Sequence, residues 1–154
     1  MSINKEKKEN LMRTVMHEVE EAIKEGNSPF GAILIDENGN IIEKAHNTAK
    51  SMCNPVLHAE INLITKACKK LDTRDLSKYY IMSNAWSCSM CMSACIKAKI
   101  QNYIYGAPSE ETMNPNVTIF DIKDKSKTEL NIEIGILENE CRLQINNARK
   151  KDLN

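Results

Sequence analysis

The sequence has no excess of charge of either sign and contains few aromatic residues. Lysine and arginine together number 21, as do aspartate and glutamate, so the formal net charge is 0. A chain without a general positive field lacks the attraction on which non-specific nucleic-acid binding depends. Aromatic residues make up 5% of the chain, which leaves few rings for stacking of exposed bases. The composition therefore disfavours a nucleic acid as the main partner.

Long apolar runs are also missing. No segment approaches the roughly 20 consecutive apolar residues that a membrane-spanning helix requires. The N-terminal sequence MSINKEKKENLMRT has neither the apolar stretch nor the small-residue cleavage site of a signal peptide. We therefore expect a cytoplasmic protein without a membrane partner. The 154 residues suit a single domain, which we expect to span residues 1–154.

The spacing of apolar residues predicts helices that alternate with strands. Helical spacing is present at 11–23, 57–71, 91–98 and 137–148, and short apolar runs typical of strands lie at 31–36, 41–46, 79–83, 100–105 and 132–136. The first two strands flank an Asn-Gly loop and predict a hairpin. Within the polar region 107–128, only 117–122 is apolar enough to suggest a short strand or a loop anchor. This order predicts an α/β fold, a three-layer α/β/α sandwich with a mixed five-stranded sheet.

Four residues at two expected helix starts carry the chemistry. His58 and Glu60 open the second predicted helix, and Cys88 and Cys91 open the third. One imidazole and two thiolates suit Zn²⁺ and leave the fourth tetrahedral position open, as in catalytic zinc sites. The positive end of a helix dipole also favours thiolates at a helix N-terminus. A carboxylate two residues after a ligand can exchange protons with water at the open position, provided that His58 lies at or just before the first turn.

The cysteines allow other interpretations. In a chain without a signal peptide, six cysteines are better interpreted as thiols or metal ligands than as disulfides. Cys88, Cys91 and Cys95 form a C-x2-C-x3-C pattern, which also occurs in redox pairs and metal clusters and could form a four-ligand zinc site with Cys141. We favour catalytic zinc because His58 and Glu60 stand where such a site needs them. The other cysteines are expected in the apolar core or as a free loop thiol: Cys53, Cys68, Cys95 and Cys141.

The pattern H-x-E followed by C-x2-C is typical of zinc-dependent deaminases. The chain resembles the cytidine deaminase-like superfamily, and most closely its guanine deaminase and tRNA adenosine deaminase branch. The segments that carry the resemblance are Asn27–Ala32 (NSPFGA), His46–Thr48 (HNT), His58–Ile64 (HAEINLI) and Tyr105–Gly106 followed by Ser109–Glu110. It covers roughly residues 10–146. One departure is that the family commonly has Glu-Pro directly before the first cysteine, whereas this chain has Trp86 and Ser87.

The resemblance implies roles for individual residues. His58, Cys88 and Cys91 would hold Zn²⁺, and Glu60 would be the catalytic residue that carries a proton from the attacking water to the ring and to the departing amine. Asn47 would hydrogen-bond the ring. The expected substrate-binding residues are Phe30, Gly31, Ala32, Asn47, Ala59, Trp86, Ser87 and Glu110, with Glu111 almost equally suitable in place of Glu110. Trp86 could cover the metal or form a wall against which a base stacks.

We therefore predict zinc-dependent hydrolytic deamination of a nucleobase or nucleoside, with guanine-like purines preferred and ammonia released. This would place the protein in purine metabolism, with a small-molecule substrate and no nucleic-acid partner. A homodimer is expected, because family members of this kind usually pair. The alternatives are a tRNA adenosine deaminase, a deaminase-like binding module without activity, and a thiol redox protein that uses Cys88 and Cys91.

Overall fold

A computed structural model describes residues 3–108 and 113–152. The five strands are β1 (Gly31–Ile35), β2 (Ile41–His46), β3 (Tyr80–Ala85), β4 (Asn102–Ala107) and β5 (Asn131–Glu133). The helices are α1 (Lys5–Lys24), α2 (Ala59–Leu71), α3 (Ser89–Lys97), α4 (Ile119–Lys125) and α5 (Glu138–Asp152). The strands form one mixed sheet in the order β2-β1-β3-β4-β5, which confirms the predicted fold class.

The direction of the strands brings several chain segments to one edge of the sheet. β1 runs antiparallel to both β2 and β3, whereas β3, β4 and β5 are parallel. Parallel neighbours need a crossover, and α3 and α4 supply the two that join β3 to β4 and β4 to β5. The carboxyl ends of β2, β3 and β4 therefore share an edge with the start of β1. In open α/β sheets such an edge is the usual place for a ligand site.

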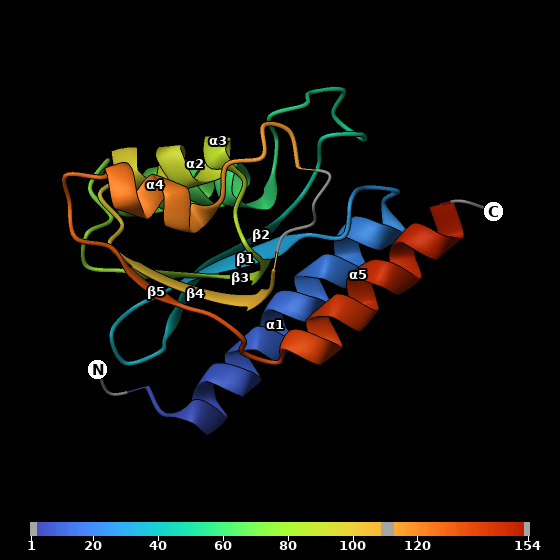
Figure 1. Ribbon diagram of the computed structural model, residues 1–154, viewed down its shortest axis with the longest axis horizontal. Coiled ribbons are helices and arrows are strands. Elements are labelled where there is room, and N and C mark those ends of the chain that lie inside the picture. Colours follow the sequence, from blue (N-terminus) through green and yellow to red (C-terminus); the bar gives the residue numbers. More distant parts are fainter. Residues whose placement is uncertain (1–2, 109–112, 153–154) are drawn as a thin grey trace.

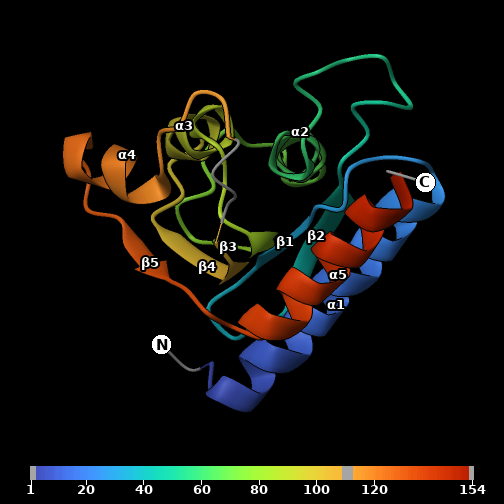
Figure 2. The same cartoon turned by 45° about the vertical axis from the view of Figure 1, so that its right-hand side comes forward.

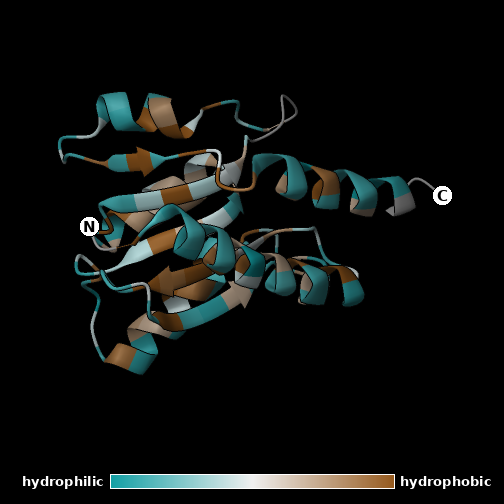
Figure 3. Ribbon diagram, turned by 90° about the horizontal axis from the view of Figure 1, so that it is seen from below, coloured by the Kyte–Doolittle hydropathy of each residue, from teal (hydrophilic) through white to brown (hydrophobic). Residues whose placement is uncertain are grey.

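Helices cover both faces of the sheet. In Figures 1 and 2, α2, α3 and α4 lie on one face, and α1 and α5 lie side by side on the other. A separate apolar core fills each interface: Leu63, Met92 and Tyr103 belong to the first, and Met12 and Ile33 to the second. Seen from the side of α1 and α5, much of the outward surface of α1 is hydrophilic (Figure 3). The result is the predicted three-layer sandwich.

The first helix packs closely on the first strand. The side chain of Asn4 caps α1 by accepting a hydrogen bond from the N–H of Lys7 at 2.9 Å. A Cβ atom on Gly31 would lie 3.0 Å from the carbonyl oxygen of Val15 and 3.1 Å from Cβ of Glu18. The absence of a side chain at Gly31 therefore allows α1 to approach β1. This close packing fixes the position of the start of β1, which lies at the edge of the sheet where the carboxyl ends of β2, β3 and β4 meet.

The prediction of a strand or loop anchor at 117–122 is wrong, because α4 begins at Ile119. Thr118 and Asp121 form a capping box: the hydroxyl oxygen of Thr118 accepts from the N–H of Asp121 at 3.3 Å, and the Asp121 carboxylate accepts from the N–H of Thr118 at 2.9 Å. These hydrogen bonds satisfy backbone donors that a helix start otherwise leaves unpaired. In the part of the chain that the structure describes, no helix is long and apolar enough to cross a membrane.

Candidate active site

Two helix starts bring the predicted zinc ligands together. His58 is the N-cap residue of α2 and Cys88 that of α3, and both have extended backbones, with ψ angles of 163° and 168°. Because His58 stands just outside the helix, its side chain is free of the regular helical spacing that would otherwise direct it away from Glu60. Both helices begin at the edge where β3 ends, and α3 carries Cys91 in its first turn. His58 therefore lies just before the first turn of α2, as it must for its side chain and that of Glu60 to reach the same site.

The distances between the three side chains suit Zn²⁺. Nδ1 of His58 lies 3.5 Å from Sγ of Cys88 and 3.4 Å from Sγ of Cys91. A tetrahedral zinc ion with bonds of about 2.3 Å to sulfur and about 2.0–2.1 Å to nitrogen places those two atoms about 3.5 Å apart. The ligand atoms of all three residues lie within 4.8 Å of one another. The donor set and its spacing therefore fit a zinc ion with one position open for water.

The electrostatics of the three side chains favour metal binding. Hydrogen bonding from Cys91 lowers the pKa of Cys88 to about 4, against the opposing effect of burial, and His58 contributes in the same direction. The hydrogen bond with Cys88 correspondingly raises the pKa of His58. The hydrogen bond of the Cys91 thiol with Cys88 and its burial both raise the pKa of Cys91. One ligand is thus already a thiolate near neutral pH, which is the form that binds zinc.

The remaining cysteines do not join this group. Among residues 3–108 and 113–150, the group of three or more potential metal ligands that lies close enough to hold an ion consists of His58, Cys88 and Cys91. Cys95 belongs to the core beneath α2 and α3, whereas Cys141 belongs to the core between the sheet and α5. Because the sheet separates Cys95 from Cys141, the alternative of a four-ligand site that includes both is wrong.

Glu60 is a buried carboxyl group beside the metal ligands. It is 6% exposed, and burial raises its pKa, although a hydrogen bond with the Ser87 side chain acts in the opposite direction. The hydroxyl of Tyr105 in turn donates to the hydroxyl oxygen of Ser87 at 2.9 Å. A buried carboxyl group with a raised pKa next to a metal site is a candidate acid and base.

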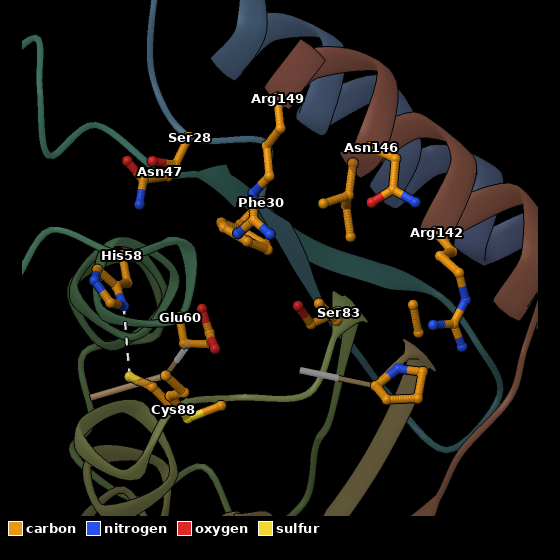
Figure 4. A pocket seen from close by; sticks show the side chains of 15 residues that line it. Ser28, Phe30, Asn47, His58, Glu60, Ser83, Cys88, Arg142, Asn146 and Arg149 are labelled. Carbon is orange, nitrogen blue, oxygen red and sulfur yellow. Dashed lines mark hydrogen bonds between the residues drawn. The ribbon is translucent and has the colours of Figure 1, made fainter. Parts of the chain in front are cut away.

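A cavity of about 320 Å³ opens from this group along the sheet edge. Its lining residues come from six parts of the chain: Ser28, Phe30, Asn47, His58, Glu60, Ser83, Ala85, Cys88, Ala107, Pro108, Met113, Arg142, Ile145, Asn146 and Arg149. In Figure 4, His58, Cys88 and Glu60 lie on one side and the α5 side chains on the other. Cavities of this size commonly hold small molecules.

Two of the predicted substrate contacts line the cavity. Asn47 and Phe30 are tied together by a hydrogen bond from the N–H of Asn47 to the carbonyl oxygen of Phe30 at 3.0 Å. The amide oxygen of Asn47 accepts from the N–H of Ala49 at 3.0 Å, which fixes the orientation of its side chain. Phe30 and Asn47 are thus held in fixed positions at the mouth of the cavity, across from His58 (Figure 4).

The other predicted contacts lie behind the cavity wall or outside the described residues. The N–H and carbonyl of Gly31 are hydrogen-bonded to Asn84 and Ser83, while Ala32 and Ala59 are fully buried. The ring of Trp86 packs edge-on against Phe120 of α4, with centroids 5.2 Å apart, and does not line the cavity. Ser87 is buried and contacts Glu60 from behind. Glu110 and Glu111 lie outside the described residues.

The wall that α5 provides was not predicted from the sequence. Arg142, Asn146 and Arg149 follow one another at intervals of four and three residues, so one face of the helix presents all three to the cavity. The guanidinium of Arg149 lies 5.7 Å from the ring centre of Phe30. Helical spacing could have placed the three residues on one face, but no local pattern indicates that this face borders the cavity.

Known proteins with sequences similar to this chain include deaminases. Residues 5–107 match the family described as the cytidine and deoxycytidylate deaminase zinc-binding region. A tRNA-specific adenosine deaminase from Aquifex aeolicus is 32% identical over 118 residues, which cover 77% of each chain. A guanine deaminase from Bacillus subtilis is 33% identical over 79 residues, which cover 51% of this chain and 50% of the relative.

Solved structures show the same fold. A chain from a study of tRNA deaminases that edit A to I at the wobble position has a TM-score of 0.78 at 23% identity, covering 86% of this chain and 96% of its own. A guanine deaminase from Nitrosomonas europaea has a TM-score of 0.78 at 21% identity, covering 92% and 84%. Because the names of the relatives include enzymes of tRNA, the expectation that a nucleic acid is not a partner has no support among them.

Proposed function

Because the chain belongs to the cytidine and deoxycytidylate deaminase family, we propose that this zinc-dependent hydrolytic deaminase acts on an aminated purine. The observation that carries the proposal is that His58, Cys88, Cys91 and the buried Glu60 meet at one end of a cavity. The purine class is supported by the names of the relatives, since adenosine and guanine are both aminated purines.

The residues of the site have different roles in the reaction. His58, Cys88 and Cys91 would hold Zn²⁺, which would supply the Lewis acidity that makes a water molecule nucleophilic at neutral pH. Glu60 accepts the proton that this water loses as its oxygen bonds to the amine-bearing ring carbon. It then delivers this proton to a ring nitrogen. In the second half of the reaction, Glu60 takes the proton of the hydroxyl group newly bonded to the ring carbon and passes it to the amine, so that the C–N bond breaks, a carbonyl forms and ammonia leaves. Burial raises the pKa of Glu60, which favours the proton-bearing form that the carboxyl group needs when it returns the proton.

The other residues of the cavity orient the ring and limit the access of water. Asn47 is placed to hydrogen-bond a ring edge, and the Phe30 side chain provides a flat apolar surface. Ala85, Ala107 and Ile145 add apolar surface to the wall. Fixed polar groups in an otherwise apolar cavity orient a ligand before reaction.

Two purines are candidates for the ring. The sequence analysis favoured a guanine-like base or nucleoside, whereas the curated relatives that share most of this chain are named for adenosine in tRNA. Ammonia release should be compared across guanine, adenine, cytosine, their nucleosides and an anticodon stem-loop RNA that contains adenosine. Turnover restricted to cytosine or cytidine would contradict the purine assignment.

The role of Glu60 is tested by Glu60→Ala. We expect zinc to remain near one ion per chain while ammonia release falls by about 10²- to 10⁴-fold, the usual contribution of a general acid and base. Metal analysis and a coupled ammonia assay measure the two quantities. Glu129→Gln, which changes an exposed carboxylate outside the cavity, is the matched control and should keep full activity. Undiminished turnover by Glu60→Ala would refute the proposed mechanism.

A further inference from the structure

The segment that joins β2 to α2, residues 47–58, begins and ends in the site. Asn47 follows the last residue of β2, and His58 immediately precedes α2. Both residues line the cavity (Figure 4). Between them the chain forms turns and contains neither a helix nor a strand. The position of Asn47 relative to His58 therefore depends on the hydrogen bonds that hold this segment.

One side chain of α2 contacts both ends of the segment. Nδ2 of Asn62 lies 2.9 Å from the carbonyl oxygen of His46 and 2.8 Å from Oγ1 of Thr48. These two residues stand directly before and after Asn47. The same nitrogen lies 3.4 Å from the carbonyl oxygen of Leu57, at the other end of the segment. An amide nitrogen has two hydrogens to donate, so the two shorter contacts beside Asn47 are its main hydrogen bonds.

Asn62 is itself fixed relative to the first metal ligand. Its backbone N–H donates to the carbonyl oxygen of His58 at 3.0 Å, which begins the hydrogen-bond pattern of α2. The side chain of Asn62 therefore lies one turn along the helix from His58, where it reaches the end of β2. Asn62 thus links the helix that carries His58 and Glu60 to the backbone on either side of Asn47.

The outer part of the segment is held by a different side chain. The N–H of Ser51 donates to the amide oxygen of Asn27 at 2.9 Å, and the amide nitrogen of Asn27 donates to the Ser51 hydroxyl oxygen at 3.0 Å. Met52 and Val56 are 64% and 45% exposed. The outer part is therefore tied to the end of α1, whereas Asn62 ties the inner part to α2.

We propose that Asn62 is a positioning residue for the deamination, because its side-chain amide holds Asn47 in a set place relative to the metal ligands and Glu60. The inference rests on the proposed function, in which Asn47 hydrogen-bonds the ring. The N–H of Ala49 occupies the amide oxygen of Asn47, so the NH₂ group of Asn47 remains to donate to a ring edge. Asn62 does not line the cavity and acts through Asn47. A displaced Asn47 would bind the ring less well, since hydrogen bonds weaken steeply with poor distance and angle.

The test separates positioning from folding. Kinetics are measured with the purine base, nucleoside or anticodon stem-loop RNA from which the zinc-loaded wild type releases ammonia fastest. Asn62→Ala should raise KM by about three- to tenfold, the range expected for one weakened hydrogen bond to the ring, and change kcat by no more than about twofold. Zinc should remain near one ion per chain, because the backbone bond to His58 is kept. A purely structural role would lower the amount of active protein, and with it kcat, at constant KM. An unchanged KM therefore overturns the inference.

Further variants locate the effect. Asn62→Leu has nearly the same volume but no donor and should match Asn62→Ala, whereas Asn62→Gln keeps the donor and should recover part of the wild-type KM. Thr48→Val removes one acceptor and should give a smaller rise. In an Asn47→Ala background, Asn62→Ala should change KM little further, and additive effects would overturn the inference. The control Thr65→Ala removes a hydroxyl that donates to the carbonyl oxygen of Ile61 at 2.8 Å on the same helix and should change neither KM nor zinc content.

Hydrogen exchange of the zinc-loaded protein without substrate gives a measurement that does not depend on turnover. The N–H of Asn47 donates to the carbonyl oxygen of Phe30 at 3.0 Å, and Asn62→Ala should speed its exchange about tenfold while the amides in the middle of α2 are unaffected. If exchange at Asn47 responds but the wild type releases no ammonia from any purine, Asn62 still holds Asn47 and the proposed function fails. If the wild type deaminates a purine but Asn62→Ala changes neither exchange nor KM, the proposed function stands and the positioning role is refuted.

Discussion

Ser87 is the residue at which this chain departs most informatively from the proteins it resembles. Where the family commonly has proline, a buried hydroxyl accepts a hydrogen bond from Tyr105 at 2.9 Å and contacts the Glu60 carboxyl group. Proline could make neither contact. A hydrogen-bonded chain of three side chains therefore supports Glu60 from behind, away from the cavity. Trp86 and Ser87, the two residues that depart from the family pattern, do not line the cavity.

Removal of this hydroxyl should destabilise the fold. We expect Ser87→Ala to lower the free energy of unfolding by about 1–3 kcal/mol, because it leaves the buried Tyr105 hydroxyl only the weak sulfur acceptor of Met92, 3.7 Å away. Combined with Tyr105→Phe, the loss should be smaller than the sum of the two single variants, since both partners are then absent. Urea unfolding measures all three, with Ser93→Ala on the exposed face of α3 as control. Additive losses would show that the two hydroxyls do not interact.

His46 provides a pH-dependent link between β2 and α1. Burial alone would lower its pKa, but hydrogen bonds to Glu18 at 2.8 Å and Glu25 at 2.9 Å outweigh this effect and raise it. The imidazolium form is thus stabilised by folding. Its contribution is fully present below about pH 6.5, the pKa of an unfolded histidine, and is lost as the pH rises through the higher folded-state value.

This contribution can be measured with His46→Asn. The difference in unfolding free energy between wild type and variant should be greatest near pH 6 and decline by about 0.5–1 kcal/mol toward pH 9, a modest value because Glu25 is partly exposed. Thermal or urea unfolding across this range measures the difference. His17→Asn on the exposed surface of α1 serves as control. A difference that does not vary with pH would mean that His46 acts only through packing.

At the scale of elements, the starts of α2 and α3 and the packing of α5 define the site. Apolar spacing at 57–71 and 91–98 predicted both helices, although α2 begins at Ala59 and α3 at Ser89. The metal-ligand motif placed His58 and Cys88 at the two helix starts. It did not predict that Arg142 would border a cavity whose other members include Ser28 and Phe30. The position of Arg142 beside the cavity depends on how α5 packs against the sheet, and a local sequence pattern does not indicate this packing. The helix α4 was missed for a different reason, since its short apolar run alone does not distinguish strand from helix.

The packing of α5 can be disturbed at one glycine. A Cβ atom on Gly106 would lie 2.6 Å from Sγ of Cys141 and 2.7 Å from the carbonyl oxygen of Asn84. We expect Gly106→Ala to cost about 1–3 kcal/mol of stability, the usual range for overpacking, and to weaken the binding of a purine nucleoside in the cavity because α5 must shift. Urea unfolding and calorimetry measure both. Gly26→Ala is the control and should leave binding unchanged, because no atom lies within 4 Å of the added Cβ. Unaltered binding by Gly106→Ala would show that ligand binding does not depend on the packing of α5.

For the whole molecule, the sequence predicted the layered α/β architecture because a regular alternation of helix and strand patterns admits few folds. Residues that act through local motifs, such as His58 and Cys88, were also predicted. Trp86 was not placed correctly from sequence alone, because a tryptophan beside a ligand can point toward the metal or toward the core. Its contact with Phe120 requires α4, which the sequence did not predict as a helix.

The oligomeric state stays a prediction. By resemblance we expect a homodimer, with a mass in solution of twice the 17.5 kDa of the chain. Light scattering coupled to size exclusion, carried out at several protein concentrations, measures this mass. A single species at the mass of one chain across micromolar concentrations would contradict the prediction, and the cavity would then function within a single chain.

The two sides of the cavity come from different layers of the molecule. The groups that would hold the metal and move the proton belong to the layer of α2 and α3, whereas Arg142, Asn146 and Arg149, which line the other side, belong to α5 on the opposite face of the sheet. The groups proposed for the chemical step and those of the α5 wall thus come from separate segments of the chain. Substitution of the inner-face residues of α5 would change the wall of the cavity and leave the metal ligands and Glu60 in place.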